Sequence, residues 1–311
     1  MAGVPPSLPP GQMVTIPGRG DTWVWEAPGP PGAPTVVLLH GWMSTAALNW
    51  CGVFDELSGS FRVIAPDHRG HGRGLRGAGF SLEECADDVA ALVELFGLSH
   101  VTAVGYSMGG PIAGLLWRRH PGLVDGLVLC ATAARFAGRP ELSPVVQVVG
   151  RGMAWAVGWV PPRLVRDGAA CLSRVRGQRE TTPDPWVLAE SEGGSPAAFI
   201  QAATALNALD ARGWIPDIDV PTAVVVTTED RMVSPDRQRW LADVIPGAIA
   251  YEVRGDHRAC IDNAPEFAAT LLDACIEVTT RSVSGVAAGR ALTAPVNSGP
   301  LDTMPPTPEP A

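Results

Sequence analysis

Along this chain, short and nearly continuous apolar runs alternate with longer segments in which apolar residues recur at helical spacing. Short runs rich in β-branched residues are typical of strands buried on both faces of a parallel sheet. An opening pair of strands is expected at Met13–Ile16 and Thr22–Glu26. The buried strands are expected at Thr35–Leu39, Arg62–Ala65, Val101–Gly105, Leu127–Ala131, Thr222–Thr227 and Ala248–Val253.

The longer segments between these runs predict helices. Ser81–Phe96 opens with a serine followed three residues later by Glu84, which is a capping box, and its apolar positions have helical spacing. Met108–His120 and Ala264–Val278 show a similar pattern. Strands that alternate with helices predict an α/β protein, with a mostly parallel, doubly wound sheet and right-handed crossovers.

One long stretch interrupts the alternation and sets the domain organisation. Residues 134–215 contain helical pieces separated by Pro and Gly but no strand pattern, so they are expected to form an inserted helical cap. The core is then made of residues 13–133 and 216–279. Residues 1–12 are proline-rich and predict an extended arm. Residues 280–311 lack periodicity and end in prolines, which predicts a disordered tail.

Composition and charge exclude several classes of function. The 311 residues carry a net charge of −9, and all 23 basic residues are arginine. Without lysine, the chain has no Schiff-base lysine and no P-loop lysine. An acidic chain without a long basic run is also a poor nucleic-acid binder. The N-terminus lacks the pattern of a signal peptide and no run is long enough to span a membrane, so a cytoplasmic location is expected.

The strongest chemical signal is a G-x-S-x-G motif between a strand and a helix, at Gly105–Gly109. This context is the one in which such a serine is a nucleophile, because a very tight turn carries its hydroxyl clear of the sheet. Glycines two residues before and after Ser107 remove the Cβ atoms that would collide in the turn. The helix that follows directs backbone N–H groups towards the same point, where an oxyanion would form.

A serine nucleophile needs an adjacent base. Of the six histidines, His257 is favoured because it follows the serine along the chain and lies just after the last expected strand. The carboxyl ends of parallel strands are the edge at which α/β sites form. His257 is therefore the expected general base.

The base needs a carboxylate that fixes its tautomer. Asp230 lies just beyond the strand Thr222–Thr227, and the resulting order of serine, acid and histidine is that of an α/β-hydrolase. Asp230 is the preferred acid. The alternatives that stay open at this point are Glu229, Asp125 and Asp256.

A second glycine motif indicates a different chemistry. Gly72–Gly77 matches the dinucleotide-binding pattern G-x-G-x-x-G and follows a strand. However, Pro66–Arg69 intervenes between the strand and the glycines, and the next helix opens only near Ser81. That helix begins too late to offer its N-terminus to a pyrophosphate, so we interpret these residues as a loop over the active-site edge.

Several short motifs share one family pattern. They are His40-Gly41-Trp42, Asp67–Gly72, the Gly105–Gly109 turn, Asp230, and His257 ahead of Pro265-Glu266-Phe267. In these motifs residues 12–278 resemble the α/β-hydrolase superfamily, in particular its capped, serine esterase and lipase-like branch. The resemblance implies that the backbone N–H groups of Trp42 and Met108 form the oxyanion hole. It implies no metal and no organic cofactor.

The expected activity is hydrolysis of a small to medium, lipophilic carboxylic ester through an acyl-enzyme. Relatives that open epoxides or displace halide have aspartate where this chain has serine. The candidate pocket residues are His40, Tyr106, Trp155 and Trp159. Acyl transfer, carbon–carbon cleavage and perhydrolysis stay open, as does a non-enzymatic ligand receptor on the same fold.

The expected partner is a small-molecule acyl substrate. The stretch Val145–Val160 is apolar apart from Arg151, which is typical of a pocket wall or of a lid that contacts a membrane interface. The pattern makes no prediction about oligomeric state.

Overall fold

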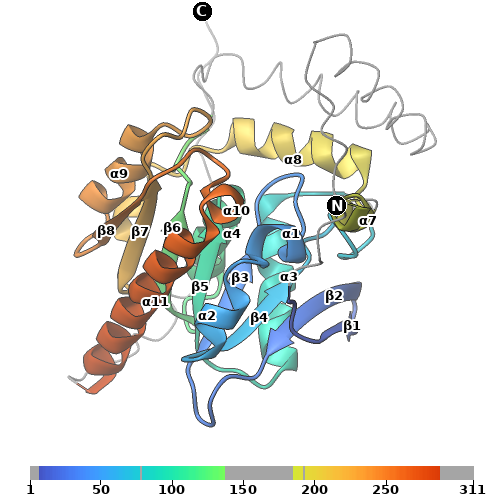
Figure 1. The fold of residues 1–311 in the computed structure, drawn as a ribbon, viewed down its shortest axis with the longest axis horizontal. Helices are drawn as coiled ribbons and strands as arrows, with labels where there is room; N and C mark the ends of the chain where they lie inside the picture. Colours follow the sequence, from blue (N-terminus) through green and yellow to red (C-terminus); the bar gives the residue numbers. More distant parts are fainter. Residues whose placement is uncertain (1–6, 78, 137–184, 192, 288–311) are drawn as a thin grey trace, which may run out of the picture.

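The computed structural model describes residues 7–77, 79–136, 185–191 and 193–287. Within these ranges, eight strands form one sheet in the order β1-β2-β4-β3-β5-β6-β7-β8 (Figure 1). β2 runs antiparallel to both of its neighbours, and all other adjacent pairs are parallel. The strands are β1 (Gly11–Ile16), β2 (Gly20–Ala27), β3 (Thr35–Leu39), β4 (Arg62–Pro66), β5 (Val101–Tyr106), β6 (Val124–Cys130), β7 (Thr222–Thr227) and β8 (Ile249–Val253). The predicted α/β class and mostly parallel sheet are confirmed.

Helices cover both faces of the sheet, as Figure 1 shows. One face packs against α3 (Leu82–Leu95), α4 (Gly109–Arg119) and α9 (Pro235–Val244). The other packs against α1 (Ala46–Trp50), α2 (Phe54–Ser58), α10 (Ala259–Asp262) and α11 (Ala264–Ala287). The remaining described elements are α7 (Pro185–Ser191), α8 (Pro196–Ala208) and the short 3₁₀ helix η2 (Ile215–Asp217).

An apolar core lies on each face of the sheet, because successive side chains along a strand point to opposite faces. In β3, Val37 and Leu39 face the α3 and α4 side, whereas Val36 and Leu38 face the α11 side. All four are fully buried, because a central parallel strand has helices on both faces. The side chain of Ser81 accepts a hydrogen bond from the backbone of Glu84, so α3 begins at the predicted capping residue.

The C-terminal helix is longer than the sequence pattern predicts. α11 continues to Ala287, so residues 280–287 do not belong to a disordered tail. Contact with the sheet persists beyond residue 279, because Ser282 is buried and its hydroxyl donates to the Asp125 carbonyl at 2.6 Å. At the other end, β1 begins at Gly11, within the expected arm.

The expected cap is described only in part. Its described residues include α7, α8 and the first residue of η2, and none of the described residues between 185 and 215 forms a strand. Residues 137–184, which include the candidate pocket residues Trp155 and Trp159, lie outside the described residues. The boundaries of the cap therefore stay a prediction.

Candidate active site

Ser107 lies on a strained turn between β5 and α4. Its φ is +52°, in a region that non-glycine residues rarely adopt. A Cβ atom at Gly105 would collide with the Gly109 carbonyl, and one at Gly109 would collide with the Leu39 carbonyl. The two glycines of the motif are thus required by backbone packing, and the turn leaves Ser107 8% exposed at the carboxyl edge of the sheet.

Asp230, His257 and Ser107 form a continuous hydrogen-bonded row. His257 Nε2 lies 2.9 Å from Ser107 Oγ, and His257 Nδ1 lies 2.8 Å from Asp230 Oδ2. The three side chains come from the ends of three different strands, β5, β7 and β8. Because the carboxylate can only accept, Nδ1 donates to it and Nε2 is left to accept the serine proton.

The carboxylate of Asp230 is held by donors on every side. Its side chain is fully buried, and its Oδ1 accepts from the backbone N–H groups of Met232 at 2.8 Å and Val233 at 2.9 Å. Burial opposes ionisation, but the hydrogen bonds from His257, Val233 and Met232 outweigh it and hold the pKa of Asp230 below its usual value. Asp230 therefore stays a carboxylate at neutral pH.

The alternative acids are engaged elsewhere. Glu229 pairs with Arg254 at 3.0 Å on the surface, and Asp256 accepts from the Arg258 backbone. Asp125 lies near the start of β6, at the opposite edge of the sheet from the serine. The geometry thus brings together the predicted serine, histidine and preferred acid.

Gln238 was not predicted from the sequence, and it supports the acid. It is fully buried on α9, and its Nε2 donates to Asp230 Oδ2 at 3.2 Å and to the Val233 carbonyl at 2.7 Å. Its Oε1 accepts from the backbone N–H of Thr227 at 2.9 Å, and the Thr227 hydroxyl donates to Asp230 Oδ2 at 3.0 Å. Gln238 thereby fixes the loop between β7 and α9.

Replacing Gln238 by Leu is expected to lower the free energy of unfolding by about 1–3 kcal/mol, because it leaves the buried Thr227 N–H without an acceptor. We also expect kcat to fall, since Asp230 loses one donor and its loop loses an anchor. Urea unfolding and ester turnover measure the two effects. Gln12→Leu, the same change at an exposed position of the edge strand β1, is the matched control. Equal stability of the two variants would contradict the role of Gln238.

The two backbone N–H groups predicted to form an oxyanion hole are those of Met108 and Trp42, and this role stays a prediction. Met108 precedes α4 and Trp42 follows β3 by three residues. Neither backbone N–H donates to an acceptor within the described ranges. The loop after β3 is held by Gly41, whose N–H donates to Asn49 Oδ1 at 2.9 Å. The side chain of Trp42 points to the cap, where its indole N–H donates to the Phe199 carbonyl of α8 at 2.9 Å.

His40 and Tyr106, two of the candidate pocket residues, are buried and hydrogen-bonded to backbone, and their place in a substrate pocket stays a prediction. His40 is fully buried, its Nε2 accepts from the His68 backbone N–H at 2.9 Å, and its Nδ1 donates to the Gly41 carbonyl at 2.8 Å. Burial lowers the pKa of His40 to about 4, so the ring is neutral. Tyr106 is 3% exposed, and its hydroxyl donates to the His257 carbonyl at 3.0 Å. Both side chains therefore hold backbone in place.

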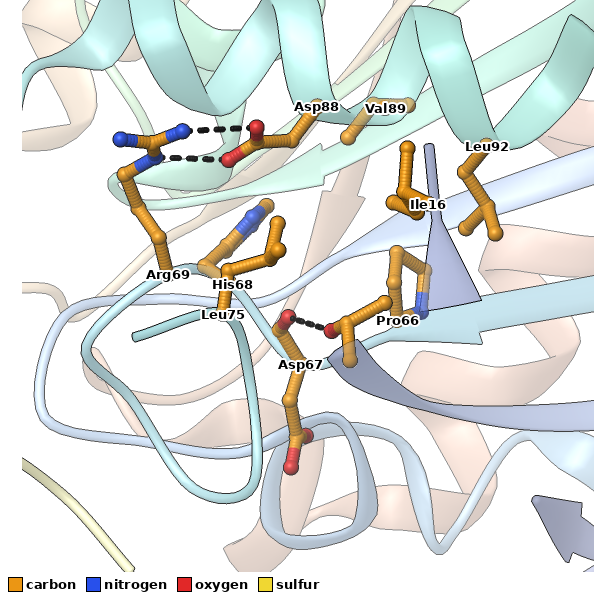
Figure 2. A pocket seen from close by; sticks show the side chains of 10 residues that line it. Ile16, Pro66, Asp67, His68, Arg69, Leu75, Asp88, Val89 and Leu92 are labelled. Carbon is orange, nitrogen blue, oxygen red and sulfur yellow. Dashed lines mark hydrogen bonds and ion pairs between the residues drawn. The ribbon is translucent and has the colours of Figure 1, made fainter. Parts of the chain in front are cut away.

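The glycine-rich loop at residues 72–77 packs against its own neighbours. The backbone N–H of Arg73 donates to Asp67 Oδ2 at 2.8 Å, and a Cβ atom at Gly74 would collide with the His68 carbonyl. Figure 2 shows the residues that line a cavity beside this loop, among them Arg69 and Asp88, which form an ion pair. Its volume is about 10 Å³, which is room for roughly one water molecule. A dinucleotide has no place there.

The described ranges contain no candidate membrane span and no candidate metal site. None of the helices there is long and apolar enough to cross a bilayer. No group of three or more His, Cys, Asp or Glu side chains there is arranged to hold a metal ion.

Comparison with known proteins gives a consistent result. The family model described as the alpha/beta hydrolase fold matches residues 34–257. A pimeloyl-[acyl-carrier protein] methyl ester esterase of Aromatoleum aromaticum is 31% identical over 224 residues, which cover 69% of this chain and 87% of that protein.

Two solved structures are similar over most of the chain. An enol-lactonase from Burkholderia xenovorans is 28% identical with a TM-score of 0.65, covering 86% of this chain and 100% of the other. A thermophilic esterase from Thermogutta terrifontis is 25% identical with a TM-score of 0.66, covering 88% and 99%.

Proposed function

Since the chain belongs to the α/β-hydrolase fold family, we propose that it is a serine hydrolase that cleaves a carboxylic ester through an acyl-enzyme. The observation that carries the proposal is the hydrogen-bonded row of Asp230, His257 and Ser107 at the carboxyl edge of the sheet. The ester as the bond cleaved is supported by relatives that are named as esterases, at 31% and 25% identity.

The geometry supports a two-step reaction. Ser107 Oγ attacks the ester carbonyl while His257 Nε2 takes its proton, and the imidazolium is stabilised by Asp230. The backbone N–H groups of Trp42 and Met108 hold the oxyanion as the carbonyl becomes tetrahedral. His257 then returns the proton to the departing alcohol. In the second step His257 activates a water, which releases the acid and restores the serine.

The preference for lipophilic esters is a proposal from the sequence of the cap. Each methylene moved from water to an apolar pocket contributes about 0.8 kcal/mol, so two extra carbons are expected to raise kcat/KM roughly tenfold until the pocket is full. Replacing both Trp155 and Trp159 by Ala is expected to flatten this rise while leaving acetyl ester turnover nearly unchanged. Measuring kcat/KM for 4-nitrophenyl acetate, butyrate and octanoate in both proteins checks this. A strict preference for acetate would contradict it.

A covalent probe tests the proposed enzyme class itself. A fluorophosphonate is expected to label Ser107, and labelling should protect the serine from a second probe. An idle triad in a ligand receptor would label poorly. Partition of the acyl group between water and an added alcohol then separates a hydrolase from an acyltransferase, since a hydrolase gives mainly the free acid.

A further inference from the structure

A second cavity lies where the chain that leaves β6 meets α9. Its volume is about 350 Å³, which is in the size range of small-molecule sites. Three segments that are far apart in the sequence form its walls. The lining residues are Ala133, Ala134, Arg135, Arg212, Asp236, Arg237 and Trp240.

Two hydrogen bonds to backbone carbonyls bring the three arginines of this cavity together. The Ala211 N–H donates to the Ala134 carbonyl at 2.8 Å, which places the segment that returns from the cap beside the segment that follows β6. Arg237, in the first turn of α9, donates through Nη1 to the Phe136 carbonyl at 3.0 Å. The positive side chains are therefore held at one place by the fold, in a protein whose net charge is −9.

The three arginines that line the cavity differ in whether an acidic partner neutralises them. Arg212 forms two hydrogen bonds with Asp210, at 2.8 and 2.5 Å, and is neutralised by them. Arg237 is bonded to a carbonyl, which leaves its charge uncompensated. Arg135 has an enclosed Nη2 that finds no hydrogen-bond partner within the described part of the chain. The one acidic lining side chain, Asp236, is 96% exposed and lies 3.6 Å from Arg239.

We propose that this cavity is a binding site for a small organic anion, namely a carboxylate or a phosphate monoester with an apolar body. A guanidinium can only donate, and its planar fork matches the oxygens of these two groups. The anion would face the positive charges of the Arg135 and Arg237 side chains, both of which line the cavity. The apolar body would lie against Trp240 and the two alanines.

The segment that lines the cavity also contacts the turn that carries Ser107. Thr132 immediately precedes the lining alanines, and its hydroxyl donates to the Ser107 carbonyl at 2.7 Å. The anion could therefore come from two sources, the remote end of an ester substrate or a separate small molecule. Binding of the anion does not depend on the proposed ester hydrolysis and is measured without turnover.

The test is direct binding by titration calorimetry with the full chain. Phenylacetate and phenyl phosphate are expected to bind at one site, and the uncharged phenylacetamide to bind at least roughly tenfold more weakly, because it lacks the charge-assisted bonds. Arg135→Gln and, separately, Arg237→Gln should weaken both anions by roughly tenfold or more. Arg119→Gln, the same change at the end of α4, is the matched control, because Arg119 pairs with Asp87 of α3 and neither residue lines the cavity.

The outcomes are separable from those of the proposed function. Anion binding that survives in Ser107→Ala supports the site whether or not the protein hydrolyses esters. If mono(4-nitrophenyl) adipate loses its kcat/KM advantage over 4-nitrophenyl hexanoate in Arg135→Gln, the anion belongs to the substrate. If phenyl phosphate binds without competing with either ester, the anion is a separate ligand. Failure of both anions to saturate, or equal affinity in wild type, Arg135→Gln and Arg237→Gln, overturns the proposal.

Discussion

Replacing Ser107 by Ala is expected to lower kcat by roughly 10⁴-fold or more while the protein folds normally, as for other serine triads. The hydroxyl that is lost has His257 as its partner and lies at the surface of a turn, so little else depends on it. The side chain of alanine is no larger than that of serine, so the positive φ at this position should cost alanine no extra strain. The turn should therefore keep its shape.

The measurement is turnover of 4-nitrophenyl butyrate together with a thermal unfolding curve. Ser234→Ala is the matched control, because Ser234 precedes α9 without forming a side-chain capping bond, and it should keep wild-type turnover. Fluorophosphonate labelling should disappear in Ser107→Ala alone. Retention of a tenth of the wild-type turnover would show that another residue is the nucleophile.

The second large effect is expected at the acid. Asp230→Asn should lower kcat by roughly 10⁴-fold with the fold preserved, because an amide facing Nδ1 favours the tautomer whose Nε2 carries the proton. Such an imidazole cannot accept the proton of Ser107. Asparagine keeps one oxygen, which can still accept from the backbone N–H groups of Met232 and Val233, so the loop should stay in place.

The alternative acids supply the controls. Glu229→Gln, Asp125→Asn and Asp256→Asn each remove one carboxylate that does not contact His257, and each should keep turnover close to that of the wild type. A silent Asp230→Asn combined with a strong loss in any of these three would assign the acid to a different position.

The hydrogen-bonded row of Ser107, His257 and Asp230 could be predicted because the positions of these residues follow from local rules. A serine between two glycines after a strand requires one particular turn, and residues just beyond parallel strands gather at one edge. Gln238 could not be predicted in this way. It lies in the helix after the loop of Asp230, and only the path of that loop brings its amide to the carboxylate.

Local sequence also does not predict which neighbours of the site are buried. His40 and Tyr106 are adjacent in sequence to the loop after β3 and to Ser107, but both side chains lie in the interior and are hydrogen-bonded to backbone. The end of α11 was placed too early because the small residues after Val278 lack an apolar signal, although Ser282 packs against the sheet and bonds to its backbone. The short helices α1 and α2 carry too few residues for their periodicity to be recognised.

The hydrogen bond from the Trp42 indole to the Phe199 carbonyl has a consequence for protein engineering. The loop that carries the proposed oxyanion donor Trp42 is thereby hydrogen-bonded to α8, so we expect this helix to be needed together with the core. A chimaera that keeps α8 and receives a foreign cap upstream of it should retain the wild-type turnover number on small esters. A graft that also replaces α8 would need a carbonyl oxygen at the position of the Phe199 carbonyl, so that the Trp42 indole N–H keeps an acceptor.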